Sequence, residues 1–417
     1  MLFLPDDQGK LMKYVLVIGD GMADYPVPEL DGKTPLQVAR KPNMDSIAAK
    51  GRSGLLRTVP DGFNPGSDTA ILSLLGYDPR QFSVARGALE SAARGITLEE
   101  HDVAFRCNLI TAENGVLVDH SAGHITTPEA EQLMAAVKDA FEKPGEVDFF
   151  TGLDYRHFLV MRNLPDSNLI ECAPPHDFIG ERVEAVLPKA KSTKAENAAN
   201  LLRRMVLDSK AVLEAHPVNA ARRKAGKRMG NMIWPWGGGE KPSLPTFEEK
   251  YGLHAAVISA VDLFKGIAVY TDMQVINVPG ATGMYDTNYE GKAEAALRAL
   301  EENDFVFVHV EAPDEAGHER NAKRKVKAIE DLDARLLAPL LEGLREPYTI
   351  SVLPDHPTPI TVGTHTSDPV PFAIQSPFQA PDDARKFDEI SAKKGAFGLV
   401  ENKSLVSLLL AAGKVSI

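Results

Sequence analysis

Short apolar runs alternate along most of this 417-residue chain with longer segments in which apolar residues recur at helical spacing. The first run, KYVLVIGD, is rich in β-branched residues and ends in Gly-Asp, which is typical of a parallel strand buried on both faces. The strand-like runs are 13–20, 254–260, 304–314 and 348–355. The segments with helical spacing are 43–51, 67–79, 291–302 and 323–344. This alternation predicts an α/β fold with helices on both faces of the sheet.

The pattern changes between about residues 92 and 240. A Glu-Asn-Gly sequence at 113–115 separates two strand-like runs, which indicates a β-hairpin. A helical segment at 196–216 is followed by a glycine-rich stretch, and the α/β pattern resumes at about residue 252. We therefore expect a discontinuous α/β domain interrupted by a smaller α+β domain. The expected bounds are 1–91 with 241–417 for the first and 92–240 for the inserted one.

The composition is that of an ordinary globular protein, with 44% hydrophobic and 25% charged residues. A formal net charge of −12 argues against a nucleic-acid or anionic-membrane partner, because either requires a basic face. It does not exclude a small anionic substrate, which needs only a local group of cations. The two cysteines, Cys107 and Cys172, cannot form a disulfide framework or a cysteine-rich zinc site. No segment has the roughly 18 apolar residues of a membrane span, and the first ten residues lack the features of a signal peptide. We therefore expect a cytoplasmic protein.

Three of the predicted strands end in acids or imidazoles, and one more imidazole follows on the loop after the last of them. The six residues are Asp20, Asp314, His318, Asp355, His356 and His365. Asp314 and His318 are four residues apart behind Pro313, so a helix that starts there would place both side chains on one face. Because ligands of open α/β sheets collect at the carboxyl ends of the strands, we expect the six side chains to converge.

Carboxylates and imidazoles without a thiolate suit borderline divalent ions such as Mn²⁺ or Zn²⁺. Six ligands are enough for two ions, and two ions about 4 Å apart are the usual arrangement for in-line phosphoryl transfer. Each residue alone has a simpler explanation, the Asp as a cap or turn residue and the His as a surface or core polar group. We interpret His309, inside the apolar run FVFVHV, as a strand residue near the site and not as a ligand. The coincidence of acids and imidazoles at strand ends favours a dinuclear site.

Ser67 is the candidate nucleophile. It follows a Pro-Gly turn and begins a helical segment, where backbone N–H groups and the helix dipole favour an anionic phosphoryl group. A serine hydroxyl is a weak nucleophile near pH 7, and coordination to a divalent ion would favour its alkoxide. The same serine could also serve as an N-cap, and the two roles are compatible.

Six motifs together resemble the cofactor-independent phosphoglycerate mutases, and in particular their archaeal-type branch, which also occurs in bacteria, within the alkaline phosphatase superfamily. They lie in the expected order between about residues 13 and 412: VIGDGMADYP, KPNMDSIAAKG, NPGSDTAILSLLGYDP, APDEAGH, LPDHPTP and THTSDPVPF. The resemblance implies an alkaline-phosphatase-like domain, a three-layer α/β sandwich, interrupted by a transferase domain. It also implies 2,3-bisphosphoglycerate-independent conversion of 3-phosphoglycerate to 2-phosphoglycerate, a step of glycolysis and gluconeogenesis.

The resemblance further implies a role for each site residue. Ser67 is similar to the serine that becomes phosphorylated. The ion that also touches this serine would be held by Asp20, Asp355 and His356, and the second ion by Asp314, His318 and His365. The implied cofactors are two divalent ions, preferably manganese, with zinc, cobalt and magnesium as alternatives. Ser67 would take the phosphoryl group, the insertion would retain glycerate, and the phosphoryl group would return to the other hydroxyl.

Holding the glycerate carboxylate calls for cationic side chains in the insertion. The candidates are Arg106, His124, Arg156, Lys227 and Arg228, with Asp119 for proton transfer. A surface Arg or Lys is most often only solvated, so these assignments rest on the implied function. In VDHSAGHIT, His120 and His124 stand where the resemblance leads us to expect arginine, which leaves the substrate open.

Other activities therefore remain open. A homoserine kinase-like phosphotransferase would use ATP, and the stretch APPHDFIGERVEAVLP is compatible with that subgroup. VPELDGKT imitates the end of a Walker A motif, but Val27 stands where the motif requires glycine. A metal-dependent phosphatase or phosphodiesterase is a further alternative, although the large insertion favours retention of the acceptor. A purely structural metal-binding protein is disfavoured because Ser67 accompanies the six potential ligands.

Overall fold

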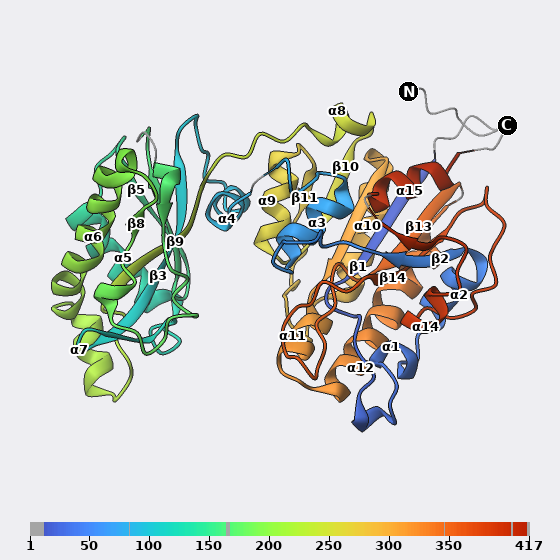
Figure 1. Ribbon diagram of the computed structural model, residues 1–417, viewed down its shortest axis with the longest axis horizontal. Coiled ribbons are helices and arrows are strands. Elements are labelled where there is room, and N and C mark those ends of the chain that lie inside the picture. Colours follow the sequence, from blue (N-terminus) through green and yellow to red (C-terminus); the bar gives the residue numbers. More distant parts are fainter. Residues whose placement is uncertain (1–11, 83, 164–166, 346, 402, 415–417) are drawn as a thin grey trace. The chain divides into compact units, whose positions relative to one another are not determined.

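The computed structural model describes residues 12–82, 84–163, 167–345, 347–401 and 403–414. The first ten residues, on which the signal-peptide prediction rests, lie outside these ranges. The chain divides into two compact units (Figure 1). The second unit is Val84–Ser243, and the first consists of the chain on either side of it. The insertion expected at 92–240 lies inside the second unit.

An eight-stranded sheet forms the middle of the first unit. Its strands are β1 (Lys13–Gly19), β2 (Arg52–Leu56), β10 (Ala255–Ile258), β11 (Gln274–Ile276), β12 (Phe305–Val310), β13 (Tyr348–Leu353), β14 (Val370–Gln375) and β15 (Gly398–Val400). Their order is β11-β10-β12-β1-β13-β14-β2-β15. Neighbours from β11 to β13 are parallel, β14 is antiparallel to β13 and β2, and β15 is parallel to β2. The central strands are buried on both faces, as their continuous apolar sequences require.

Helices cover both faces of this sheet, which gives three layers (Figure 1). One layer contains α1 (Pro35–Val38), α2 (Pro42–Lys50), α10 (Tyr289–Glu302), α12 (Ala322–Asp331) and α13 (Ala338–Gly343). The other contains α3 (Ser67–Leu75), α8 (Phe247–Tyr251), α9 (Asp262–Tyr270) and α15 (Leu405–Ala412). The remaining helices are α11 (Ala312–His318), α14 (Glu389–Ala392) and the short 3-10 turn Pro28–Leu30.

The alternation of side chains along β12 assigns each residue to one of these layers. Val306 and Val308 pack in the core with α10 and α12. Phe307 and His309 point the other way, where the ring of Phe264 on α9 contacts both of their rings. His309 therefore faces the layer that contains α3.

The second unit is an α+β structure built on an antiparallel sheet. Its strands are β3 (Val103–Glu113), β4 (Val116–Asp119), β5 (Val147–Leu153), β6 (Arg156–Met161) and β9 (Met232–Glu240), with a separate pair, β7 (Ile170–Glu171) and β8 (Lys189–Ala190). Its helices are α4 (Arg86–Ala93), α5 (Thr127–Phe141), α6 (Glu196–Glu214) and α7 (Pro217–Lys224), with 3-10 turns at Ser167–Leu169, Val183–Ala185 and Thr193–Ala195. The predicted hairpin joins β3 to β4 through Asn114 and Gly115, both at positive φ. No helix in the described ranges has the length and apolarity to cross a membrane.

Two predicted segments differ from the structure. The run 304–314 is a strand only as far as Val310, and α11 then begins at Ala312 with Pro313 in its first turn. The segment 323–344 is not one regular α-helix, because a π-helical stretch, Leu332–Leu337, separates α12 from α13. Pro339 has no N–H to donate to the carbonyl four residues earlier, which accounts for the wider turn ahead of it.

Candidate functional site

The strand order explains why the predicted ligands converge. β1 lies between β12 and β13 and is parallel to both, so the carboxyl ends of all three meet at one edge of the sheet. Asp20 follows β1, and its backbone N–H donates to the carbonyl of Val310 at 2.9 Å. Asp355 follows β13, and its Oδ1 accepts from the N–H of Gly21 at 3.3 Å. These two hydrogen bonds fix the ends of the three strands against one another.

One cluster at this edge consists of Asp20, His309 and Asp355. Each residue is at most 2% exposed, and one potential ligand atom from each lies within 4.8 Å of the others. Nε2 of His309 lies 3.2 Å from Oδ2 of Asp20. One carboxylate oxygen of each acid, Asp20 Oδ1 and Asp355 Oδ2, is buried without a hydrogen-bond partner among the described residues. Such oxygens are free to bind a cation.

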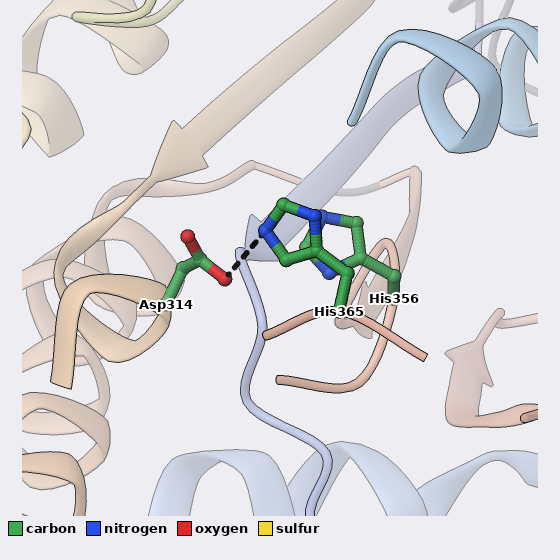
Figure 2. Close-up of side chains that lie close together, drawn as sticks. All are labelled: Asp314, His356 and His365. Carbon is green, nitrogen blue, oxygen red and sulfur yellow. Dashed lines mark ion pairs between the residues drawn. The ribbon is translucent and has the colours of Figure 1, made fainter. Parts of the chain in front are cut away.

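The second cluster consists of Asp314, His356 and His365. Figure 2 shows Asp314 facing His365, with the ring of His356 behind the His365 ring. Nε2 of His365 lies 3.5 Å from Asp314 Oδ1, and the centroids of the two imidazole rings are 4.1 Å apart. His318 joins the group from α11, with its Nε2 3.1 Å from Asp314 Oδ2 and 3.0 Å from Nε2 of His365. Asp314 and His318 thus share one face of a helix, as their spacing predicts.

His356 connects the second cluster to the first. Its Nε2 is 3.5 Å from Asp20 Oδ1 and 3.4 Å from Asp355 Oδ2, and its ring also packs on His365. The Oγ atom of Ser67 lies 3.1 Å from the same nitrogen. The structure therefore brings all six predicted ligands and the candidate nucleophile into one site.

Ser67 is the first residue of α3, and Gly66 is the N-cap. Gly66 makes no side-chain cap, and the N–H of Thr69 donates to Oδ1 of Asp68 at 2.8 Å. The N–H groups of Ser67 and Asp68 are those that the helix N-terminus offers to an anion. The preceding carbonyl, of Pro65, lies 3.3 Å from Nδ1 of His365, which ties the start of the helix to the second cluster. The hydroxyl thus combines a helix N-terminus with a set of carboxylates and imidazoles.

The first cluster concentrates negative charge in a buried space. Burial, followed by the nearby carboxylates of Asp355 and Asp314, raises the pKa of Asp20 well above its usual value. Burial acts on Asp355 in the same direction, but the imidazoles of His356 and His309 lower its pKa overall. Two adjacent carboxylates that resist ionising together form a site where a cation is strongly favoured.

His309 is the residue whose importance the sequence did not reveal. The sequence places it near the site but outside the ligand set, whereas the structure groups it with Asp20 and Asp355. Its Nδ1 lies 3.4 Å from the Oγ of Ser259. The available signal was a polar residue near the carboxyl end of an otherwise apolar strand, with Ile18 beside it in β1.

The candidate substrate residues all lie in the second unit. Asp119 ends β4, where its Oδ2 accepts from Nη1 of Arg228 at 2.6 Å. Its Oδ1 accepts from both the N–H and the Oγ–H of Ser121 at 2.7 Å. Burial would raise the pKa of Asp119, but the hydrogen bonds from Ser121 and Arg228 lower it to about 2. Asp119 is therefore a carboxylate at neutral pH.

Arg106 belongs to a different group on the same unit. Its Cζ atom lies 4.6 Å from the ring centroid of Trp236, and its Nε lies 3.2 Å from an oxygen of Glu90. The Trp236 ring contacts His176, and His176 contacts His120, with centroid separations of 5.3 Å and 6.2 Å. Sequence analysis did not identify Trp236 or His176, because nothing in the chain signals contacts across so many residues.

Arg156 joins the group around Trp236 through Tyr155. The ring centroid of Tyr155 lies 5.4 Å from Cζ of Arg156, and the same ring contacts His120. His124 and Lys227 adjoin the Asp119 group through the backbone. The N–H of His124 donates to Ser121 Oγ at 3.4 Å, and that of Lys227 donates to a carbonyl at the end of α7 at 2.9 Å. The five candidates are thus divided between two groups of the same unit.

Comparison with known proteins identifies the family of this chain. The profile of the 2,3-bisphosphoglycerate-independent phosphoglycerate mutases matches residues 48–219. A protein of that name from Methanosarcina acetivorans is 52% identical over 403 residues, which are 96% of this chain and 100% of the relative. The chain belongs to this family.

Solved structures agree with this membership. The cofactor-independent phosphoglycerate mutase of Thermoplasma acidophilum is 28% identical, with a TM-score of 0.70 and coverage of 97% of this chain and 100% of that one. A Pyrococcus horikoshii protein is 32% identical, with a TM-score of 0.83 and coverage of 97% and 99%. The resemblance and the α/β fold drawn from the sequence are confirmed, and the chain is an enzyme of the isomerase class.

We predict that His318 makes the stability of the metal-free enzyme depend on pH. The hydrogen bond to Asp314 raises the pKa of His318 to about 9 from 6.5, so its contribution is complete below pH 6.5 and is lost as the pH rises to about 9. The side chain is 36% exposed, and after solvent screening we expect a loss of about 1 kcal/mol. Urea unfolding of chelator-treated protein at both ends of this range measures the loss.

His318→Gln should remove this pH-dependent loss, because an amide does not titrate. The matched control is His254→Gln, which replaces an imidazole that is 66% exposed on the same unit and should keep the wild-type dependence. An identical pH dependence in His318→Gln and the wild type would contradict the assignment.

Proposed function

We propose that this protein interconverts 3-phosphoglycerate and 2-phosphoglycerate without 2,3-bisphosphoglycerate, through phosphorylated Ser67. The observation that carries the proposal is the position of Ser67 Oγ, 3.1 Å from His356 Nε2 at the N-terminus of α3 and next to both clusters. A hydroxyl in such surroundings suits transfer of a dianionic phosphoryl group. Relatives that match over nearly the whole chain and carry the mutase name support the same activity.

We further propose that two divalent ions bind among these carboxylates and imidazoles. One would be held by Asp20, Asp355 and His356 with Ser67, and the other by Asp314, His318 and His365. The residues fit this role because buried oxygens of Asp20 and Asp355 have no hydrogen-bond partner among the described residues. The oxygen and nitrogen donors suit manganese, with zinc, cobalt and magnesium as alternatives. Bound ions would stabilise the charge that develops on the transferring phosphoryl oxygens.

The chain's own residues then divide the reaction into two transfers. In the first, Ser67 Oγ bonds to phosphorus, the bond from phosphorus to the substrate oxygen breaks, and glycerate is left with a hydroxyl. In the second, the other glycerate hydroxyl attacks phosphoserine and Ser67 recovers its proton. The N–H groups at the start of α3 hold the phosphoryl oxygens through both transfers.

The second unit, close to the predicted 92–240, is proposed to retain glycerate between the transfers. The side chains proposed to bind the glycerate carboxylate are those of Arg106, Arg156, Arg228, His124 and Lys227. Asp119 is ionised at neutral pH and is proposed to take part in proton transfer to or from the glycerate hydroxyls. Retention of glycerate, and not its release, is what separates a mutase from a phosphatase.

The first experiment compares activities on one manganese-loaded preparation. Conversion of 3-phosphoglycerate to 2-phosphoglycerate is followed by a coupled assay without 2,3-bisphosphoglycerate, beside ATP-dependent phosphorylation of homoserine and release of inorganic phosphate. We expect the conversion alone to proceed at a substantial rate. Homoserine phosphorylation as the dominant activity would contradict the proposed substrate.

We predict that Ser67→Ala reduces turnover by about three orders of magnitude or more, because the nucleophile is removed. Radiolabelled substrate, quenched in acid, should leave label on the Ser67 peptide of the wild type and none on the variant. The matched control is Ser73→Ala on the same helix, which should keep both turnover and label. Unchanged turnover in Ser67→Ala would exclude it as the nucleophile.

We predict that metal removal abolishes turnover and that added Mn²⁺ restores it. His365→Ala should lower the bound metal from about two ions per chain to about one, because it removes a ligand of one cluster only. Metal analysis after dialysis measures the content, and His254→Ala is the control because that imidazole is 66% exposed and lies outside both clusters. Two tightly held ions in His365→Ala would show that this histidine is not a ligand.

A further inference from the structure

One buried hydroxyl connects residues of both proposed ligand sets. Thr358 lies on the loop after β13, and its side chain is fully buried. Its Oγ1 donates a hydrogen bond to Oδ1 of Asp314 and lies 3.3 Å from Nδ1 of His356. In the function proposed above, Asp314 and His356 serve different ions. Thr358 is thus in direct contact with one ligand of each.

The donors and acceptors at this hydroxyl can be assigned. A hydroxyl has one hydrogen, and an ionised Asp314 can only accept, so the hydrogen of Thr358 is directed to Asp314. Toward His356 the hydroxyl oxygen can then only accept a hydrogen bond. Nδ1 of His356 must therefore carry the ring hydrogen and donate it. A neutral imidazole with its hydrogen on Nδ1 has a lone pair on Nε2, the nitrogen that faces Ser67.

The position of Thr358 is itself fixed by a buried lysine. Lys325 of α12 is fully buried, and its Nζ donates to the carbonyl of Thr358 at 2.8 Å and to Oδ2 of Asp24 at 2.8 Å. Asp24 lies on the loop after β1, and it accepts from the N–H of Ile360 at 3.2 Å. The N–H of Thr358 donates to the carbonyl of Ala23 at 3.3 Å. The two loops that carry the ligands are therefore joined through Lys325 and Thr358.

Gly21 and Gly317 pack closely against Thr358. A Cβ atom on Gly21, which has a φ of +61°, would lie 2.6 Å from both Thr358 Oγ1 and Asp314 Oδ1. A Cβ atom on Gly317 would lie 2.4 Å from the carbonyl oxygen of Thr358. Glycine is thus required on both sides of the Thr358–Asp314 contact.

We propose that Thr358 is a positioning residue that sets both ligand groups at once. Its hydroxyl orients the Asp314 carboxylate and fixes the tautomer that presents His356 Nε2 to the site. This inference rests on the proposed metal sites. Its tests measure Mn²⁺ affinity and the tautomer of His356, so they do not depend on which substrate the enzyme converts. Loss of the hydroxyl weakens the binding of both ions, whereas loss of a single ligand affects mainly one.

Mn²⁺ binding isotherms on wild type, Thr358→Val and Thr358→Ser test the proposal. Valine keeps the shape and removes the hydroxyl, so we expect both affinities to fall about 10- to 100-fold, while serine stays within about threefold of the wild type. Thr361→Val on the exposed part of the same loop is the matched control and should bind as the wild type. Thermal unfolding of the metal-free proteins verifies that each variant is folded. Wild-type affinity for both ions in folded Thr358→Val would overturn the proposal.

A second measurement uses no variant of Thr358, so its outcome does not depend on whether such a variant folds. In the metal-free wild type labelled with ¹⁵N-histidine, the nitrogen shifts of His356 should show a protonated Nδ1 and a bare Nε2. The signals of His356 are assigned as those that are present in the wild-type spectrum and missing from the spectrum of His356→Asn. A His356 ring with its hydrogen on Nε2 would overturn the proposal even if valine at position 358 prevented folding.

Discussion

The site depends on the burial of negative charge at the ends of three adjacent parallel strands. The register of β1 with β12 and β13 places Asp20 and Asp355 together in a space closed to solvent, where burial raises the pKa of Asp20. Isolated buried carboxylates are costly, so they must be protonated, paired with cations or bound to metal. The N–H of Gly21, which donates to Asp355 Oδ1 at 3.3 Å, supplies part of this compensation. The carboxylate oxygens that have no hydrogen-bond partner in the described part of the chain indicate where a cation would bind.

The two units contribute different chemistry to the proposed reaction. The first offers carboxylates, imidazoles and the hydroxyl of Ser67 at a helix N-terminus, which suits the handling of a phosphoryl group. The second offers guanidinium groups, one paired with the ionised Asp119 and one stacked on Trp236. Guanidinium groups suit a carboxylate, whereas the site of the first unit suits a phosphoryl group, and a phosphoglycerate carries one of each.

The sequence predicted the fold class and the convergence of ligands because both follow from local patterns. Continuous apolar runs mark buried parallel strands, and acids at their ends meet because parallel strands share one edge. The contacts of His309 and Thr358 could not be predicted in this way. His309 approaches Asp20 only through the register of β12 with β1, and Thr358 reaches Asp314 across 44 residues of sequence. A histidine in an apolar strand and a threonine in a loop carry no local signal of such contacts. The π-helical stretch before α13 likewise depends on one proline within an otherwise helical pattern.

The most direct test of this account is anomalous X-ray scattering from crystals of the protein grown with Mn²⁺. The account predicts two peaks about 4 Å apart, one between Asp20 and Asp355 and within bonding distance of Ser67 Oγ, the other at Asp314, His318 and His365. A single peak, or peaks remote from the Ser67 hydroxyl, would contradict the claim that buried carboxylates at the three strand ends assemble a dinuclear centre around a serine.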